Sequence, residues 1–195
     1  FETGTFQNFD WEFEGDANWQ SDVMEIFEGN FSGRSGSISD NQESTMSVTL
    51  DIIEAGQISF YKKVSCESTG SVTGNYYDYL SFSIDGIEMG KWAGEINWSL
   101  ESFQVSAGNH TFKWAFIKDQ AVTSGSDATW VDFIVFPPLE IHDCGSGDIN
   151  EDGINNVLDV VSLVNCVLSH DCETCHGDLN QDGILNVLDV VLLLN

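Results

Sequence analysis

The end of the chain contains one short sequence written twice, and this duplication constrains the fold more than any other feature. Residues 147–165 read GDINEDGINNVLDVVSLVN, and residues 177–195 read GDLNQDGILNVLDVVLLLN. Aligned without gaps, the two copies agree at 14 of 19 positions. Sequences this similar adopt the same local structure, so the last quarter of the chain is predicted to contain two copies of one small unit.

Each copy places oxygen-bearing side chains at the spacing of a calcium-binding loop. Loop positions 1, 3, 5, 9 and 12 carry Asp or Asn, position 6 is Gly, and position 7 offers its backbone carbonyl. The predicted ligands are Asp148, Asn150, Asp152, Ile154, Asn156 and Asp159 in the first loop, and Asp178, Asn180, Asp182, Ile184, Asn186 and Asp189 in the second. Three carboxylates per loop supply the charge for one Ca²⁺. The alternative is two Asx-rich turns without metal.

Each loop leads into a helix rather than following one. Val157, Val160, Val161 and Val164 recur at helical spacing after the first loop, and no helix pattern precedes either loop. Position 12 is Asp instead of the Glu of an EF-hand. Over residues 147–195 this combination resembles a dockerin module, and the NVLDVV motif resembles the C-terminal modules of many secreted marine bacterial proteins.

The dockerin resemblance implies a protein partner. Dockerins anchor secreted bacterial proteins to cohesin domains, and loop positions 10 and 11 face that partner. These positions hold Val157, Leu158, Val187 and Leu188. The best-known dockerins have polar pairs there, so two other occupants of this apolar surface stay open: copies of the same chain, and the chain's own first domain.

Four of the five cysteines lie in the last 52 residues, and this density predicts disulfides in an oxidising compartment. The candidates are Cys144, Cys166, Cys172 and Cys175. Four cysteines allow three pairings, which sequence does not distinguish. The stretch CETCH matches a c-type haem attachment pattern, but a small polar link has no apolar pocket for a macrocycle, so no haem is expected. Zinc held by these cysteines with His170 or His176 is the alternative.

The charge balance excludes several classes of partner. The chain has 32 acidic and 6 basic residues, a net charge of −26, which repels nucleic acid and anionic lipid. Its apolar runs are far shorter than the ~20 residues that span a bilayer. Because the sequence begins with Phe1 rather than Met, we expect a processed product or a fragment. The cysteine density predicts that the protein is extracellular or at the cell surface.

Upstream of Pro137-Pro138 the apolar pattern has period two. The stretches QISFYKK, YLSFSID, HTFKWAF and TWVDFIVF are predicted strands, as are residues 23–27, 45–51 and 98–105. About eight antiparallel strands in ~135 residues predict a mostly β protein, an antiparallel β-sandwich of the jelly-roll type, followed by the small α-helical dockerin-like module. The expected domains are 1–138 and 147–195, joined by a linker at 139–146.

Short phrases in the first domain carry a second resemblance. FETGTF, DWEFEG, GRSGSISDNQES, AGNHTFKW and GSDATWVDFIVFPP, in this order, resemble the jelly-roll modules of secreted bacterial adhesins and peptidases, related in architecture to laminin-G-like and cleaved-adhesin domains. Modules of this kind bind sugars or proteins, or act as spacers. The resemblance therefore implies a class of domain and no particular ligand.

Few candidate sites stand out in the first domain. Trp92 and Trp98 are weak candidates for a sugar-stacking platform, and Glu2 and Asp132 for a third calcium ion. No nucleophile motif or phosphate-binding loop occurs, so we expect no enzyme. The sequence therefore predicts a non-catalytic extracellular calcium-binding protein that mediates assembly. The alternative is a carbohydrate-binding module with a dockerin, cut from a larger secreted enzyme.

Overall fold

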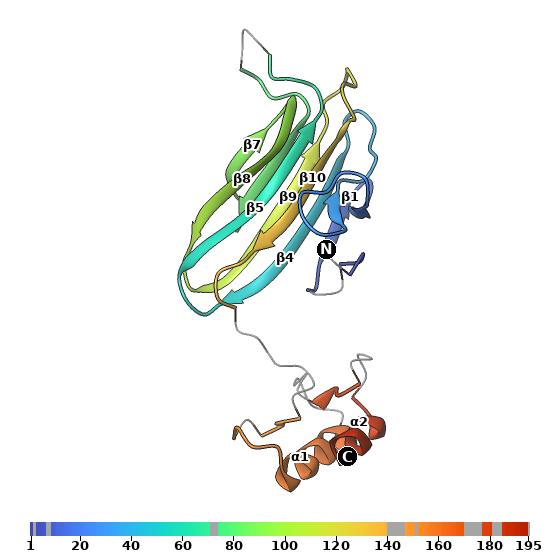
Figure 1. Ribbon diagram of the computed structural model, residues 1–195, viewed down its shortest axis with the longest axis vertical. Helices are drawn as coiled ribbons and strands as arrows, with labels where there is room; N and C mark the ends of the chain where they lie inside the picture. Colours follow the sequence, from blue (N-terminus) through green and yellow to red (C-terminus); the bar gives the residue numbers. More distant parts are fainter. Residues whose placement is uncertain are drawn as a thin grey trace. The chain divides into compact units, whose positions relative to one another are not determined.

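The computed structural model describes residues 1, 3–6, 9–70, 74–139, 147–150, 152–169, 177–180 and 185–194. The chain divides into two compact units, Phe1–Glu140 and Ile141–Asn195 (Figure 1). The division falls within the segment 139–146 that the sequence analysis assigned to a linker. Each unit is described by itself below.

The first unit consists of two five-stranded antiparallel sheets (Figure 1). The first sheet has the order β1 (Glu12–Gly15), β4 (Glu43–Ile52), β9 (Gly108–Ile117), β6 (Tyr79–Ile84) and β7 (Ile87–Trp92). The second has the order β2 (Gln20–Asp22), β3 (Ser32–Arg34), β10 (Ala128–Val135), β5 (Gly56–Ser65) and β8 (Glu95–Val105). This confirms the prediction of a mostly β fold with two antiparallel sheets.

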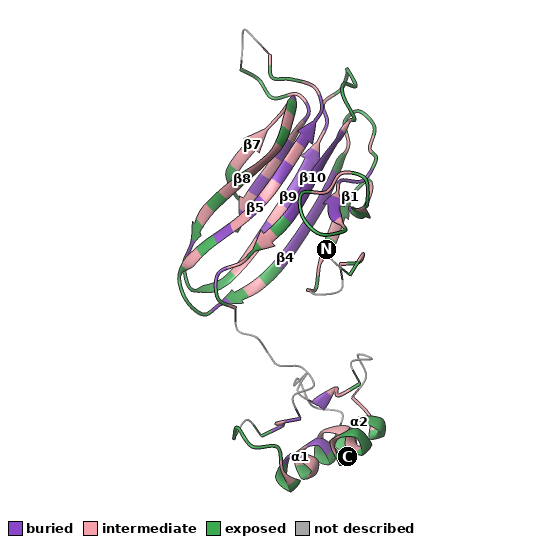
Figure 2. Ribbon diagram, viewed as in Figure 1, coloured by how far each residue is buried: buried purple, intermediate pink, exposed green. Residues whose placement is uncertain are grey.

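The core of this sandwich is built by the alternating residues that the sequence pattern identified. Successive residues of a strand point to opposite faces, so every second side chain faces the other sheet. Phe60 of β5, Phe82 of β6 and Trp114 of β9 are all 0% exposed, and their ring centroids lie 4.8–5.4 Å apart. Figure 2 shows buried residues concentrated along β4, β5, β9 and β10.

The strand prediction is wrong at one place and incomplete at others. Residues 23–27 form bends instead of a strand, because the Asp22 carboxylate accepts the backbone N–H of Met24 and turns the chain. Val23 and Met24 are mostly exposed. The described part of the chain has ten strands where about eight were predicted. The short strands β1, β2 and β3 and the edge strand β7 were not foreseen.

The second unit contains two short helices, α1 (Val157–Ser169) and α2 (Val187–Leu193). Each begins directly after the Asn at loop position 9, whose side-chain oxygen accepts the N–H two residues on, at 2.8 Å in both cases. This is an N-cap, which satisfies a backbone donor at the helix start. Among the described residues, no helix is long and apolar enough to cross a membrane.

Candidate functional site

The two C-terminal loops are closed by the same set of hydrogen bonds. In the first, Asp159 at position 12 is fully buried. Its Oδ1 accepts the backbone N–H groups of Ile149 and Asn150, at 2.9 and 3.2 Å, and its Oδ2 accepts that of Asn156, at 2.7 Å. This carboxylate therefore ties the start of the loop to the start of α1.

The second loop repeats this arrangement position by position. Asp189 is also fully buried, its Oδ1 accepting the N–H groups of Leu179 and Asn180, at 3.0 and 3.3 Å, and its Oδ2 that of Asn186, at 2.9 Å. At the described positions, the hydrogen bonds of position 12 are thus the same in both copies. Asp182 and Ile184, two of the predicted ligands, lie outside the described residues.

The remaining oxygens of the first loop are gathered by the loop's own backbone. Asp148 accepts the N–H groups of Asp152 and Gly153, at 3.1 and 2.8 Å, and Asn150 accepts that of Asp152 through Oδ1, at 3.0 Å. Gly153 has a φ of +82°, a conformation that strains side-chain-bearing residues. A loop that turns around its own oxygens in this way fits the donor set of a hard divalent cation.

Asp159 keeps its charge in this environment. The N–H groups that it accepts, that of Asn156 foremost, hold the pKa of its carboxyl below the ordinary value, although burial acts in the opposite direction. An ionised carboxylate at this position remains able to contact a cation at the loop.

The predicted partner-binding residues lie at the start of the helices and are exposed. Val157 and Leu158 are 69% and 57% exposed, and Val187 and Leu188 are 63% and 56% exposed. Each pair directly follows the capping Asn of its loop. The two repeats therefore present the same apolar pair after the same capping Asn, and we call these four residues the Val-Leu pairs.

The cysteines are partly accounted for. Cys166 of α1 is disulfide-bonded. Cys144, Cys172 and Cys175 lie outside the described residues, so their pairing stays a prediction, as does the expected absence of haem and zinc. Cys66 in the sandwich is free and buried. Burial raises the pKa of its thiol to about 12, which makes it a packing residue rather than a nucleophile.

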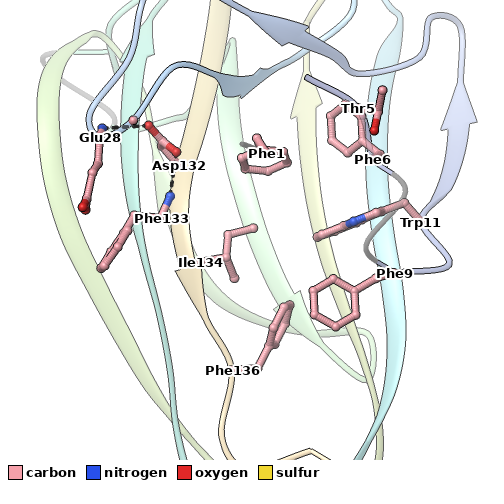
Figure 3. Close-up of a pocket in the computed structure, with 11 residues that line it drawn as sticks. Phe1, Thr5, Phe6, Phe9, Trp11, Glu28, Asp132, Phe133, Ile134 and Phe136 are labelled. Atoms are coloured by element: carbon pink, nitrogen blue, oxygen red, sulfur yellow. Dashed lines mark hydrogen bonds between the residues drawn. The ribbon is translucent and has the colours of Figure 1, made fainter. Parts of the chain in front are cut away.

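The sandwich contains an aromatic pocket of about 430 Å³ that the sequence analysis did not identify (Figure 3). The N-terminal segment faces strand β10 across it, with the Phe9 and Phe136 rings 5.4 Å apart. The pocket is lined by Phe1, Thr5, Phe6, Phe9, Trp11, Glu28, Gly29, Asp132, Phe133, Ile134 and Phe136. A concave, mostly aromatic site with a few polar groups is the usual form of a small-ligand site. Its only signal in the sequence is the aromatic density of the first 13 residues.

Asp132 lies at the edge of this pocket and is only 3% exposed. Its Oδ2 accepts the N–H groups of Phe27 and Glu28, at 2.9 and 3.1 Å, and its Oδ1 accepts that of Phe133, at 2.8 Å. It therefore fixes a loop over strand β10. Its predicted calcium partner Glu2 lies outside the described residues, and the third calcium ion stays a prediction.

The two tryptophans proposed as a sugar platform have no aromatic neighbour in common. Trp92 of β7 packs against the core, 6.3 Å from Phe60, with the Lys62 ammonium 4.8 Å from its ring. Trp98 of β8 lies 6.1 Å from Phe27, which stacks on Tyr61. The two rings belong to different sheets and contact different aromatic side chains, and a shared sugar platform stays a prediction.

No known protein family and no curated protein matches this chain. Similar solved structures include the secreted serine protease VesC from Vibrio cholerae, at 15% identity and a TM-score of 0.45, over 62% of this chain and 24% of VesC. A xylan-binding domain of Xyn10C from Paenibacillus barcinonensis has 17% identity and a TM-score of 0.43, over 68% and 86%. A cleaved adhesin domain of Lys-gingipain from Porphyromonas gingivalis has 10% identity and a TM-score of 0.48, over 68% and 92%.

The sandwich thus resembles carbohydrate-binding modules and cleaved adhesin domains in its arrangement of strands. The TM-scores are all below 0.5, and the chain spans only about a quarter of VesC. These likenesses carry no argument about what this chain binds, so its function has to be argued from its own residues.

Proposed function

We propose that the chain is a non-catalytic extracellular binding protein, in which two C-terminal loops each hold one Ca²⁺ and the Val-Leu pairs contact a protein partner. One observation carries the proposal. Two loops with identical hydrogen bonds at position 12 each present an exposed apolar pair next to a set of oxygen ligands. Metal and partner sites adjoin in both copies.

Charge supports the calcium part of the proposal. From Cys144 onward the sequence has nine acidic residues and no Lys or Arg. Loop carboxylates that converge without a cation repel one another, so metal binding and folding of such a module are coupled. Two Ca²⁺ ions offset four of the nine negative charges. They also lower the repulsion that opposes contact with another acidic surface.

Exposure supports the partner part. Burying a Val or Leu side chain that is otherwise exposed is worth about 1.5–3 kcal/mol. The four residues of the Val-Leu pairs are each more than half exposed, which supports a contact surface at these positions. The partner is a cohesin-like domain or a second copy of this chain.

Light scattering and binding to immobilised cohesin-like domains, each at millimolar calcium and after chelation, test this function. The wild-type chain is expected to associate only with calcium. A variant with Ser at Val157, Leu158, Val187 and Leu188 should still bind calcium and lose association. Leu168→Ser is the matched control, because Leu168 of α1 is 74% exposed but lies outside the pairs. A chain that stays monomeric and ignores cohesin-like partners in both conditions contradicts the proposal.

The aromatic pocket favours a second function, binding of an uncharged sugar by the sandwich. Its volume of about 430 Å³ lies within the range of small-ligand sites, and Trp11 with several Phe side chains offers apolar faces for stacking. A net charge of −26 disfavours anionic glycans. A glycan array with the wild-type chain and with Thr5→Trp, which fills the pocket, tests this function. Binding that Thr5→Trp leaves unchanged excludes the pocket.

A further inference from the structure

Three carboxylates meet at one end of the sandwich, outside both sites described above. Glu67 follows the end of β5, Asp78 precedes β6, and Asp119 follows the end of β9. One oxygen from each lies within 4.8 Å of the others. Because β5 belongs to one sheet and β6 and β9 to the other, the cluster joins the two sheets.

Two of these three carboxylates each have one oxygen that is inaccessible to solvent and has no hydrogen-bond donor. Asp78 is 0% exposed, and its Oδ2 lacks a hydrogen-bond partner although its Oδ1 accepts the backbone N–H of Asp119, at 3.0 Å. Oε2 of Glu67 is also buried without a partner. A buried carboxylate oxygen without a hydrogen bond is costly, so these positions favour a cation or a proton.

The cation already present in the fold does not satisfy the cluster. Lys118 is 3% exposed, and its ammonium donates to Asp127 while lying 3.6 Å from Asp78 Oδ2 and 3.9 Å from Asp40. The single positive charge of Lys118 is thus shared among Asp40, Asp78 and Asp127. It does not also neutralise the carboxylates of Glu67 and Asp119. Burial first, and then the charges of Asp119 and Asp78, raise the pKa of Glu67.

We propose that Glu67, Asp78 and Asp119 bind a divalent cation of the size of Ca²⁺, which fastens the two sheets together at this end of the sandwich. Carboxylate oxygens are the ligands that hard cations prefer. The three oxygens lie within 4.8 Å of one another, so one cation can contact all three. Ca²⁺ accepts irregular sets of carboxylates, whereas Mg²⁺ demands near-ideal octahedral geometry and keeps most of its waters, so Ca²⁺ is the better fit, and water completes its shell.

The distribution of tryptophan makes this site testable in the whole chain. All six Trp residues precede residue 137, so Trp fluorescence reports unfolding of the sandwich and not of the C-terminal module. A chain carrying Asp148→Ala and Asp178→Ala removes calcium binding by the loops. In this background, millimolar CaCl₂ is expected to raise the Trp-monitored melting temperature by on the order of 5 °C, and equal MgCl₂ by much less.

Substitutions then assign the shift to the cluster. Glu67→Gln, with Asp119→Asn as a second variant should the first not fold, is expected to abolish the calcium-induced shift. Glu54→Gln, at an exposed acid outside the cluster, should leave it unchanged. The proposal is overturned if calcium produces no shift in the parent. It is also overturned if Glu67→Gln keeps the shift, or if Asp132→Asn alone removes it.

Discussion

The sandwich and the C-terminal module differ in the exposure of their apolar side chains. In the sandwich, the side chains of Phe60, Phe82 and Trp114 have no exposed surface. In the described part of the module, only Ile149 and Leu163 are buried apolar residues, and most Val and Leu side chains of α1 and α2 are exposed. The buried side chains that the two loops share are instead Asp159 and Asp189.

This difference shows two ways to hold a fold together. The sandwich is stabilised by apolar burial between sheets, which needs no partner. The module is organised by carboxylates that accept backbone N–H groups, and most of its Val and Leu side chains are exposed. The comparison predicts that core substitutions damage the sandwich, whereas charge removal and chelation damage the module.

The largest expected effect is the loss of a core ring. Phe82 lies 4.8 Å from Phe60 and 4.9 Å from Trp114. Phe82→Ala should lower the free energy of unfolding of the sandwich by about 3–5 kcal/mol, measured by Trp fluorescence in guanidinium. Ile87→Ala, at a residue that is 68% exposed, is the control and should cost much less. A cost below about 1 kcal/mol for Phe82→Ala would contradict a close-packed core.

The second effect concerns thiol reactivity. Burial raises the pKa of the Cys66 thiol to about 12, so far less of it is ionised at pH 8 than of an ordinary cysteine. Alkylation of Cys66 by iodoacetamide, followed by peptide mass spectrometry, should therefore be slower in the native chain than in urea by roughly a hundredfold or more. Equal rates would mean that this end of the sandwich opens freely.

The smallest effect is at the surface of the sandwich. His110 Nδ1 lies 2.7 Å from Asp85 Oδ2, and this hydrogen bond, with the N–H of Thr111, lowers the pKa of Asp85. A carboxyl whose pKa is lowered on folding stabilises the protein at pH values above its unfolded-state pKa of about 3.9. This stabilisation is lost as the pH falls through the folded-state pKa. Because Asp85 is 46% exposed, His110→Ala should cost less than about 1 kcal/mol.

The pH dependence of the loss in unfolding free energy caused by His110→Ala shows whether the loss comes from the Asp85 hydrogen bond. Urea unfolding of wild type and His110→Ala should show the difference at pH 6 and a smaller one at pH 3. A difference that is the same at both pH values would assign the effect of His110 to packing rather than to the Asp85 hydrogen bond.

Much of the sandwich could be predicted because its long strands carry their own signal. The alternation at Ile58 and Phe60, and at Phe112, Trp114 and Phe116, follows the faces of β5 and β9. Strand β3, with the sequence SGR, has no such pattern and forms through pairing with β2 and β10. A short stretch of sequence does not reveal which distant strands will pair with it.

The candidate sites also differ in whether their residues are local or distant in the sequence. The C-terminal loops lie within single stretches of 12 residues, so their ligand spacing could be recognised from the sequence. The carboxylates of Glu67, Asp78 and Asp119 come from three separate strand ends and meet only through the register of the two sheets. Trp92 and Trp98 are close in sequence but lie in different sheets, so proximity along the chain does not by itself indicate a shared site.

The most direct test of the central claim is a calorimetric titration of calcium into the full chain, with Asp148→Ala plus Asp178→Ala as the paired variant. The account predicts that the wild-type chain binds two more Ca²⁺ ions than the variant, with helical circular dichroism rising as these two bind. A double variant that binds as many Ca²⁺ ions as the wild type, with the same affinity, would contradict it.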